Sequence, residues 1–146
     1  MYAMFISVAL LLFVLATVGF GVYAHVAIRG DTYDHALSEY LHYANEQLIG
    51  SALLLLPFLL LGLMAAAFFT RRSSIYGIVI FLIGAAILVA LYYEGHMGAE
   101  AAMTQRHWTA AALSVGLLPF QGAGVLVILL VGGLIAGRAK GAKTET

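Results

Sequence analysis

Charged residues and cysteines are scarce in this sequence. Only 10% of the 146 residues are Asp, Glu, Lys or Arg, whereas about a quarter are charged in water-soluble domains. There is no cysteine at all, which excludes disulfides, thiolate metal sites, iron–sulfur clusters and covalently attached c-type haem within the chain. The formal net charge is zero, so the composition gives no sign of a nucleic-acid-binding protein.

Long apolar runs take the place of the missing charge. Hydrophobic residues make up 63% of the chain and the mean hydropathy is +1.00. A helix needs about 20 apolar residues to span a bilayer, and four runs reach that length, at about 2–28, 48–70, 75–93 and 108–137. The first run lacks the positive start of a signal peptide, so we expect a retained helix. The sequence predicts an all-α integral membrane protein, one membrane domain over residues 1–146, with four transmembrane helices in an up-down bundle.

Lysine and arginine indicate the orientation of that bundle. The turn after the second run and the tail 138–146 carry five of the seven basic residues, Arg71, Arg72, Arg138, Lys140 and Lys143. Since basic residues stay on the cytoplasmic side, we expect both termini and this tail to be cytoplasmic, in a bacterial inner (plasma) membrane. The outer loop 29–47 and the turn 94–107 then face the periplasm. All five histidines lie on that outer side: His25, His35, His42, His96 and His107.

The outer loop predicts a short amphipathic helix at the membrane interface. Asp31 or Thr32 is suited to cap its start. His35, Glu39, His42 and Glu46 follow at offsets of 0, 4, 7 and 11, and at 3.6 residues per turn these positions share an arc of about 60°. The Glu39–His42 spacing is also that of the E-x-x-H pairs in di-iron bundles.

The turn 94–107 carries a second set with the same spacing: His96, Glu100, Met103 and His107. Gly95 and Gly98 predict a break of the helix there. His25, His42, His96 and His107 each lie near the outer end of one long run. In an up-down bundle these four would share one depth, as the ligands of a cofactor in a helix bundle do.

Several kinds of chemistry suit these side chains. Two of the four histidines could clamp a b-type haem, which needs no cysteine. Histidine with carboxylate could instead hold a non-haem iron, copper or zinc ion, with the candidate ligands His35, Glu39, His42, Glu46 and Glu100. Glu94 and Glu100, together with Glu39 and Glu46, would orient the imidazoles or carry protons, and the same groups could bind a quinol headgroup. The plainer interpretation is that polar and aromatic residues belong at the interface in any case.

The fourth run is rich in glycine. Gly133 and Gly137 form a G-x-x-x-G pattern, which is typical of close helix packing in membranes. We therefore expect contacts with other membrane subunits through this span, in addition to the lipid bilayer.

The stretch "GHMGAEAAMTQRH" resembles a family of small, uncharacterised four-helix bacterial inner-membrane proteins that are proposed to bind haem. Gly95, His96, Gly98 and His107 carry the resemblance, whereas Ala99 stands where the family has a second glycine. The resemblance covers about a dozen residues. It implies His96 and His107 as candidate haem ligands.

These observations lead to a functional hypothesis and one alternative. The leading hypothesis is a small membrane subunit with a histidine-ligated redox centre near the periplasmic face, with b-type haem ahead of a non-haem metal ion. It would pass electrons between quinol and a periplasmic partner. The alternative is an accessory subunit without a cofactor in a larger respiratory or photosynthetic complex. Whether the protein is an enzyme stays open at this point.

Overall fold

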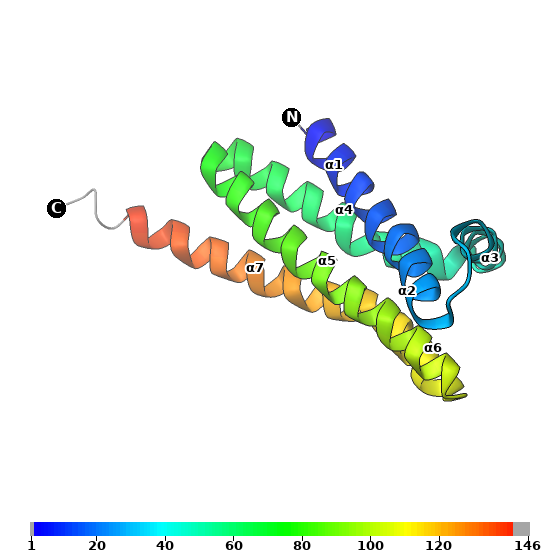
Figure 1. Ribbon diagram of the computed structural model, residues 1–146. Helices are drawn as coiled ribbons and strands as arrows, with labels where there is room; N and C mark the ends of the chain where they lie inside the picture. The colour runs from blue at the N-terminus through cyan, green and yellow to red at the C-terminus, as the bar shows by residue number, and fades with distance from the viewer. Residues whose placement is uncertain (1, 142–146) are drawn as a thin grey trace.

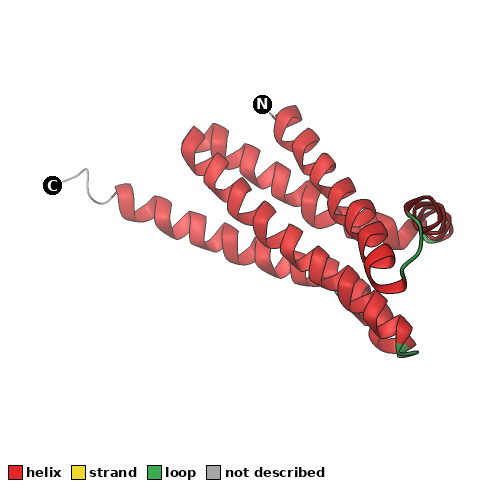
Figure 2. Cartoon of the chain, in the orientation of Figure 1, coloured by secondary structure: helices red, strands yellow, loops and turns green. Residues whose placement is uncertain are grey.

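The computed structural model describes residues 2–141, with side chains through residue 135. This part of the chain is almost entirely helical and has no strand (Figures 1 and 2). The elements are, in order, α1 (Tyr2–Val14), the π-helical turn η1 (Leu15–Gly19), α2 (Phe20–Arg29), α3 (Tyr33–Glu46), α4 (Leu48–Arg71), α5 (Ser74–Thr104), α6 (Trp108–Gly116) and α7 (Leu118–Gly141). The predicted all-α helical bundle is confirmed. The predicted tail, 138–146, lies outside the residues whose side chains are described.

Four segments of the described chain are long and apolar enough to cross a membrane: Tyr2–Arg29, Leu48–Arg71, Ser74–Thr104 and Trp108–Ile135. The protein is therefore a multi-pass membrane protein. The first two segments end within one residue of the limits that the apolar runs predict. The apolar runs locate these helices well because the bilayer core offers no water to the backbone, which must satisfy its own hydrogen bonds.

The predicted end of the third helix is wrong. The apolar run stops near Tyr93, but α5 continues without a break to Thr104. Gly95 and Gly98 face α6 and α7 rather than ending the helix. A Cβ on Gly95 would lie 2.8 Å from the Leu118 methyl carbons, and one on Gly98 would lie 3.5 Å from Ser114 Oγ. These glycines allow close packing of helices, a role that glycine often has in membrane proteins.

The middle of the bundle is the antiparallel pair α4 and α5. On one side the first span crosses this pair, with α1 against α4 and α2 against α5, and on the other side α6 packs on α5 and α7 on both. Figure 1 shows the start of α1 and the α4–α5 turn at one end of the bundle, and α3 with the α5–α6 turn at the other. Aromatic rings meet edge to face in the core, as between Phe5 and Phe81 and between Phe58 and Tyr92.

Two irregularities interrupt the spans. The first span contains the π-helical turn η1, in which the buried Thr17 donates its hydroxyl to the carbonyl of Phe13 over 2.7 Å. The last span is broken at Leu117, two residues before Pro119, which separates α6 from α7. Single π-helical turns inside helices occur frequently at functional sites, and Thr17 of this turn is hydrogen bonded to Tyr40 of α3.

Gly30 directs the chain from α2 into α3. It has φ of 78° and ψ of 16°, a left-handed conformation that suits glycine at the end of a helix, and its amide donates to the Val26 carbonyl over 3.0 Å. Thr32 is the N-cap residue of α3 without a side-chain hydrogen bond. In Figure 1, α3 is seen nearly end-on beside long helices that run across the view, so α3 lies across the end of the bundle. This is the predicted amphipathic helix.

Candidate functional site

Most of the polar side chains gather where α3 packs against the last turns of α2 and α5. We call this end of the bundle, with the α5–α6 turn, the polar end. Its buried centre is His25 on α2, which is only 6% exposed. His25 Nε2 lies 2.8 Å from Asp31 Oδ2 and 3.4 Å from Glu39 Oε2, and Nδ1 lies 3.6 Å from Glu100 Oε1. Three carboxylates from a loop and two helices therefore surround one imidazole.

Arg29 joins the same groups from one turn further along α2. Its Nε donates to Glu100 Oε2 over 2.8 Å, and its Nη1 lies 3.7 Å from Glu39 Oε1. Its Nη2 also contacts the Met103 sulfur at 3.1 Å. His25, Arg29, Asp31, Glu39 and Glu100, the ionic cluster, tie α2, α3 and α5 together. Because these groups are partly buried, their contacts are less screened than surface ion pairs.

His96 is the second buried histidine of the polar end. It lies on α5, one turn before Glu100, and is 6% exposed. Its Nε2 is buried and has no hydrogen-bond partner, and no other side-chain nitrogen or oxygen of the described residues is in that state. The Tyr40 ring from α3 lies against it, with 6.3 Å between the ring centroids.

Tyr40 is held over His96 by the first span. Its hydroxyl is hydrogen bonded to Thr17, and its ring packs directly on Gly21, where a Cβ would overlap the ring. Burial raises the pKa of the Tyr40 hydroxyl above its usual value of 10.0. Since Glu39 belongs to the ionic cluster and is the neighbour of Tyr40, the cluster and the Tyr40 cover are parts of one docking contact of α3.

The remaining predicted residues of α3 lie at its exposed face. His42 and Glu46 form an ion pair at 3.2 Å, with their side chains 72% and 56% exposed. His35 lies 4.0 Å from Glu39 and is 64% exposed. The four predicted residues of α3 therefore form two successive pairs, His35 with Glu39 and His42 with Glu46. Of the four carboxylates and histidines, Glu39 is the one that joins the ionic cluster.

His107 and Glu94 are both exposed. His107 is the N-cap residue of α6, just after the end of α5. Helix α5 thus carries His96, Glu100 and Met103 of the second set, whereas His107 lies beyond the end of α5. Of the four histidines predicted to share one depth, two are buried and two are exposed. Glu100 contacts an imidazole, as expected of an orienting carboxylate, whereas no such contact is seen for the exposed Glu94.

No group of three or more His, Asp or Glu side chains in the described part of the chain is arranged to hold a metal ion. Of the predicted ligands, Glu39 and Glu100 belong to the ionic cluster. His35 contacts Glu39 from the exposed side, and His42 and Glu46 form a separate pair. The nearest approach of two histidine rings that we find is between His25 and His35, with centroids 6.5 Å apart.

The glycine-rich α7 packs partly within the chain. A Cβ on Gly133 would lie 3.0 Å from the Phe68 ring and 3.1 Å from Ile80, so this glycine faces α4 and α5. Gly137 lies outside the residues whose side chains are described. By contrast, a Cβ on Gly124 or Gly132 would meet nothing within 4 Å. These two positions present an open face of α7.

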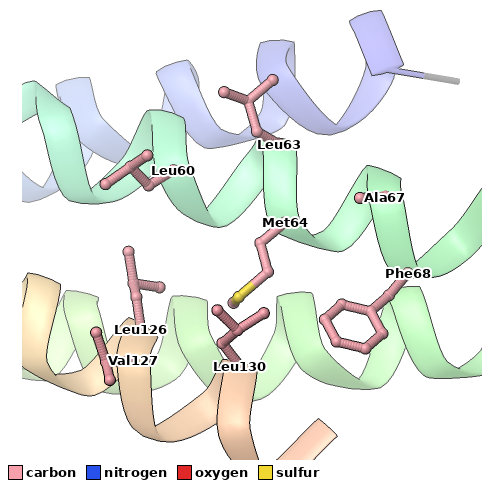
Figure 3. A pocket seen from close by; sticks show the side chains of 8 residues that line it. All are labelled: Leu60, Leu63, Met64, Ala67, Phe68, Leu126, Val127 and Leu130. Atoms are coloured by element: carbon pink, nitrogen blue, oxygen red, sulfur yellow. The ribbon is translucent and has the colours of Figure 1, made fainter. Parts of the chain in front are cut away.

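An apolar groove of about 390 Å³ lies between α4 and α7 (Figure 3). Leu60, Met64 and Phe68 line it from α4, and Leu126 and Leu130 line it from α7. Its lining has no charged or hydrogen-bonding side chain, so the groove cannot orient a polar substrate. Both buried histidines of the described chain, His25 and His96, lie at the polar end.

Sequence reasoning missed several residues of the polar end. The sequence predicts only a helix-capping role for Asp31, and its patterns indicate no role for Arg29, Tyr40 or Thr17. The His25–Asp31 contact depends on the left-handed turn at Gly30, which is a signal that the sequence does contain. The position of Tyr40 against Gly21 depends on helix packing, for which the sequence has no local signal.

No protein-family model matches this sequence, and no curated protein or solved structure is found to be similar to it.

Proposed function

We propose that this protein is a small subunit of a membrane electron-transfer complex, and that His96 holds a redox group near the periplasmic face. The observation that carries the proposal is the buried His96 Nε2 without a partner. Leaving a buried polar group unsatisfied costs about 1–3 kcal/mol, and ionisable residues kept inside a membrane protein usually serve function. A bound group that accepts a bond from this nitrogen, or donates one to it, would remove the cost.

The orientation supports the periplasmic placement. Arg71 and Arg72 end α4 at the opposite end of the bundle from α3. If this arginine-bearing end is cytoplasmic, as the positive-inside rule predicts, the polar end faces the periplasm of a bacterial inner membrane. A redox group at His96 would then be within reach of a periplasmic electron-transfer partner, and of quinol in the bilayer.

The expected b-type haem has one suitable ligand in this arrangement. His96 would hold the haem through a ring nitrogen, but both nitrogens of His25 are held by carboxylates, and His42 and His107 are exposed. The four histidines therefore do not fit a haem clamped between two of them. A haem, when bound, supplies one-electron redox chemistry. The part of this chain would be to hold it through His96 and keep water away.

The alternative function, a cofactor-free accessory subunit, is favoured by the ionic cluster. In that cluster Arg29 and His25 contact three carboxylates, those of Asp31, Glu39 and Glu100. Such contacts suit a purely structural role, in which the cluster holds α3 against the bundle. The open glycine face of α7 at Gly124 and Gly132 would then be a contact with other membrane subunits.

Absorption spectroscopy and lipid extraction test the proposal. The protein is purified with its native lipids, and spectra are recorded in the oxidised and the dithionite-reduced state. A solvent extract is then analysed for redox-active lipids. We expect a redox group that is retained by the wild type and by His107→Gln but lost in His96→Gln. If the wild type carries neither a chromophore, a metal nor a redox-active lipid, the accessory function is the better account.

A further inference from the structure

The surroundings of His96 restrict what could bind there. Tyr92 and Ala99 lie on the same face of α5, one turn before and one turn after His96, and both are buried. The Tyr40 ring from α3 lies against the imidazole, and its hydroxyl is hydrogen bonded to Thr17. The site is thus an apolar wall with two polar groups, the composition typical of sites for largely apolar ligands with a few polar atoms.

A metal cation is a poor match for this site. Cations in proteins require several donors, and a lone imidazole with a tyrosine hydroxyl has neither the number nor the charge. The nearby carboxylates already face His25 and Arg29. A neutral ring that carries hydroxyl or carbonyl oxygens needs only the hydrogen bonds that His96 and Tyr40 can make.

The ionic cluster begins one helical turn from His96 on α5 and extends to the outside of the bundle. Glu100, one helical turn from His96, contacts His25 Nδ1, and the opposite nitrogen, Nε2, contacts Asp31. Along this path the side-chain exposure is 14% for Glu100, 8% for His25 and 40% for Asp31, so the path reaches solvent at Asp31. Imidazole can take up a proton at one nitrogen and release it from the other. A ligand whose hydroxyl groups exchange protons would benefit from such a path, whereas a non-titrating ring would not.

From these three observations we propose that the His96–Tyr40 site binds the headgroup of a membrane quinone or its quinol. This inference rests on the proposed redox function and names the redox group. One ring oxygen bonds to His96 Nε2, and the Tyr40 hydroxyl bonds to the ring from α3. Tyr40 has to move outward for the ring to enter, because its own ring now lies against the His96 imidazole. Glu100, His25 and Asp31 are the positioning and proton-exchange groups behind the site.

The test is binding of a decyl-tailed 1,4-benzoquinone to the full-length protein in phosphatidylethanolamine–phosphatidylglycerol nanodiscs, with empty nanodiscs as the blank. We expect saturable binding that is about tenfold weaker in His96→Gln, since a buried hydrogen bond contributes about 1 kcal/mol or somewhat more. Tyr40→Phe, which keeps the ring and its packing, should weaken binding about threefold. His42→Gln changes an exposed histidine and should bind like the wild type.

The outcomes separate this inference from the function on which it rests. Absence of saturable binding, or equal binding by the wild type, His96→Gln and Tyr40→Phe, overturns the quinone site. Should His96→Gln fail to fold by circular dichroism, Tyr40→Phe decides. A haem absorption band that is lost in His96→Gln would overturn the quinone site and leave the redox function standing. A wild type without any redox group and without quinone binding would refute both.

Discussion

Docking of α3 on the bundle depends on the absence of a side chain at residue 21. The Tyr40 ring packs on Gly21 so closely that an added Cβ would overlap Tyr40 Cε2 and lie 2.8 Å from Cδ2. In Gly21→Ala the ring must therefore shift, and with it the segment of α3 that covers His96. Overpacking of this kind costs about 1–3 kcal/mol. The docking equilibrium of α3 should fall by about 5- to 150-fold.

Cysteine labelling measures this equilibrium directly because the natural chain has no cysteine. Ala36 lies on the docked face of α3 and is 1% exposed. In the Ala36→Cys reporter a membrane-impermeant maleimide reacts only when α3 opens. If closing is faster than labelling, the rate follows the open population. The reporter should therefore react about 5- to 150-fold faster in the Gly21→Ala background.

Gly124→Ala is the matched control. A Cβ at this position meets nothing within 4 Å, so the substitution should leave the labelling rate of the Ala36→Cys reporter unchanged. An exposed reporter, Ser38→Cys, should react at one rate in all backgrounds. Equal rates for the Ala36→Cys reporter in the Gly21→Ala and Gly124→Ala backgrounds would refute the packing of Tyr40 on Gly21.

Three further predictions concern the polar end and the core beneath it. Glu39→Gln removes a charge that faces the Arg29 guanidinium and contacts His25, and because the Glu39 side chain is 30% exposed the effect is small. Labelling of the Ala36→Cys reporter should rise only about two- to fivefold, and no change would show that the ionic cluster does not hold α3. Tyr92→Phe loses the 2.6 Å hydrogen bond from the tyrosine hydroxyl to the Leu54 carbonyl, so the free energy of unfolding in detergent should fall by about 0.5–1.5 kcal/mol. The raised pKa of Tyr40 means that docking of α3 favours the neutral hydroxyl. Docking should weaken as the pH rises above 10, as followed by electron spin resonance of a nitroxide on α3, and Tyr40→Phe should remove this weakening.

The spans were predictable because every residue of a membrane span has to suit the apolar core of the bilayer. The composition alone predicts a span at Leu48–Arg71, and it likewise predicts the first span, Tyr2–Arg29. The end of α5 was not predictable in this way. Gly95 and Gly98 resemble helix breakers in the sequence, and only the presence of α6 and α7 beside them shows that they are packing residues.

The site was predictable in its location but not in its members. The asymmetric distribution of histidines and carboxylates indicated one end of the bundle, and the cluster lies there. The spacing could not show which histidines are buried. His96 and His107 would share one face of a continuous helix, but α5 ends between them. The contact of His25 with Asp31 and the cover by Tyr40 arise from the turn at Gly30 and from packing between elements far apart in the sequence.

The central claim is that His96 Nε2 finds its partner in a bound redox ring. Nitrogen-15 magnetic resonance of histidine-labelled wild-type protein in nanodiscs tests it, because the shift of an imidazole nitrogen reports its hydrogen bond. Addition of the decyl-tailed benzoquinone should move the His96 Nε2 resonance in a saturable manner and leave that of the exposed His42 unchanged. A His96 resonance that stays in place, or moves together with that of His42, would contradict the claim.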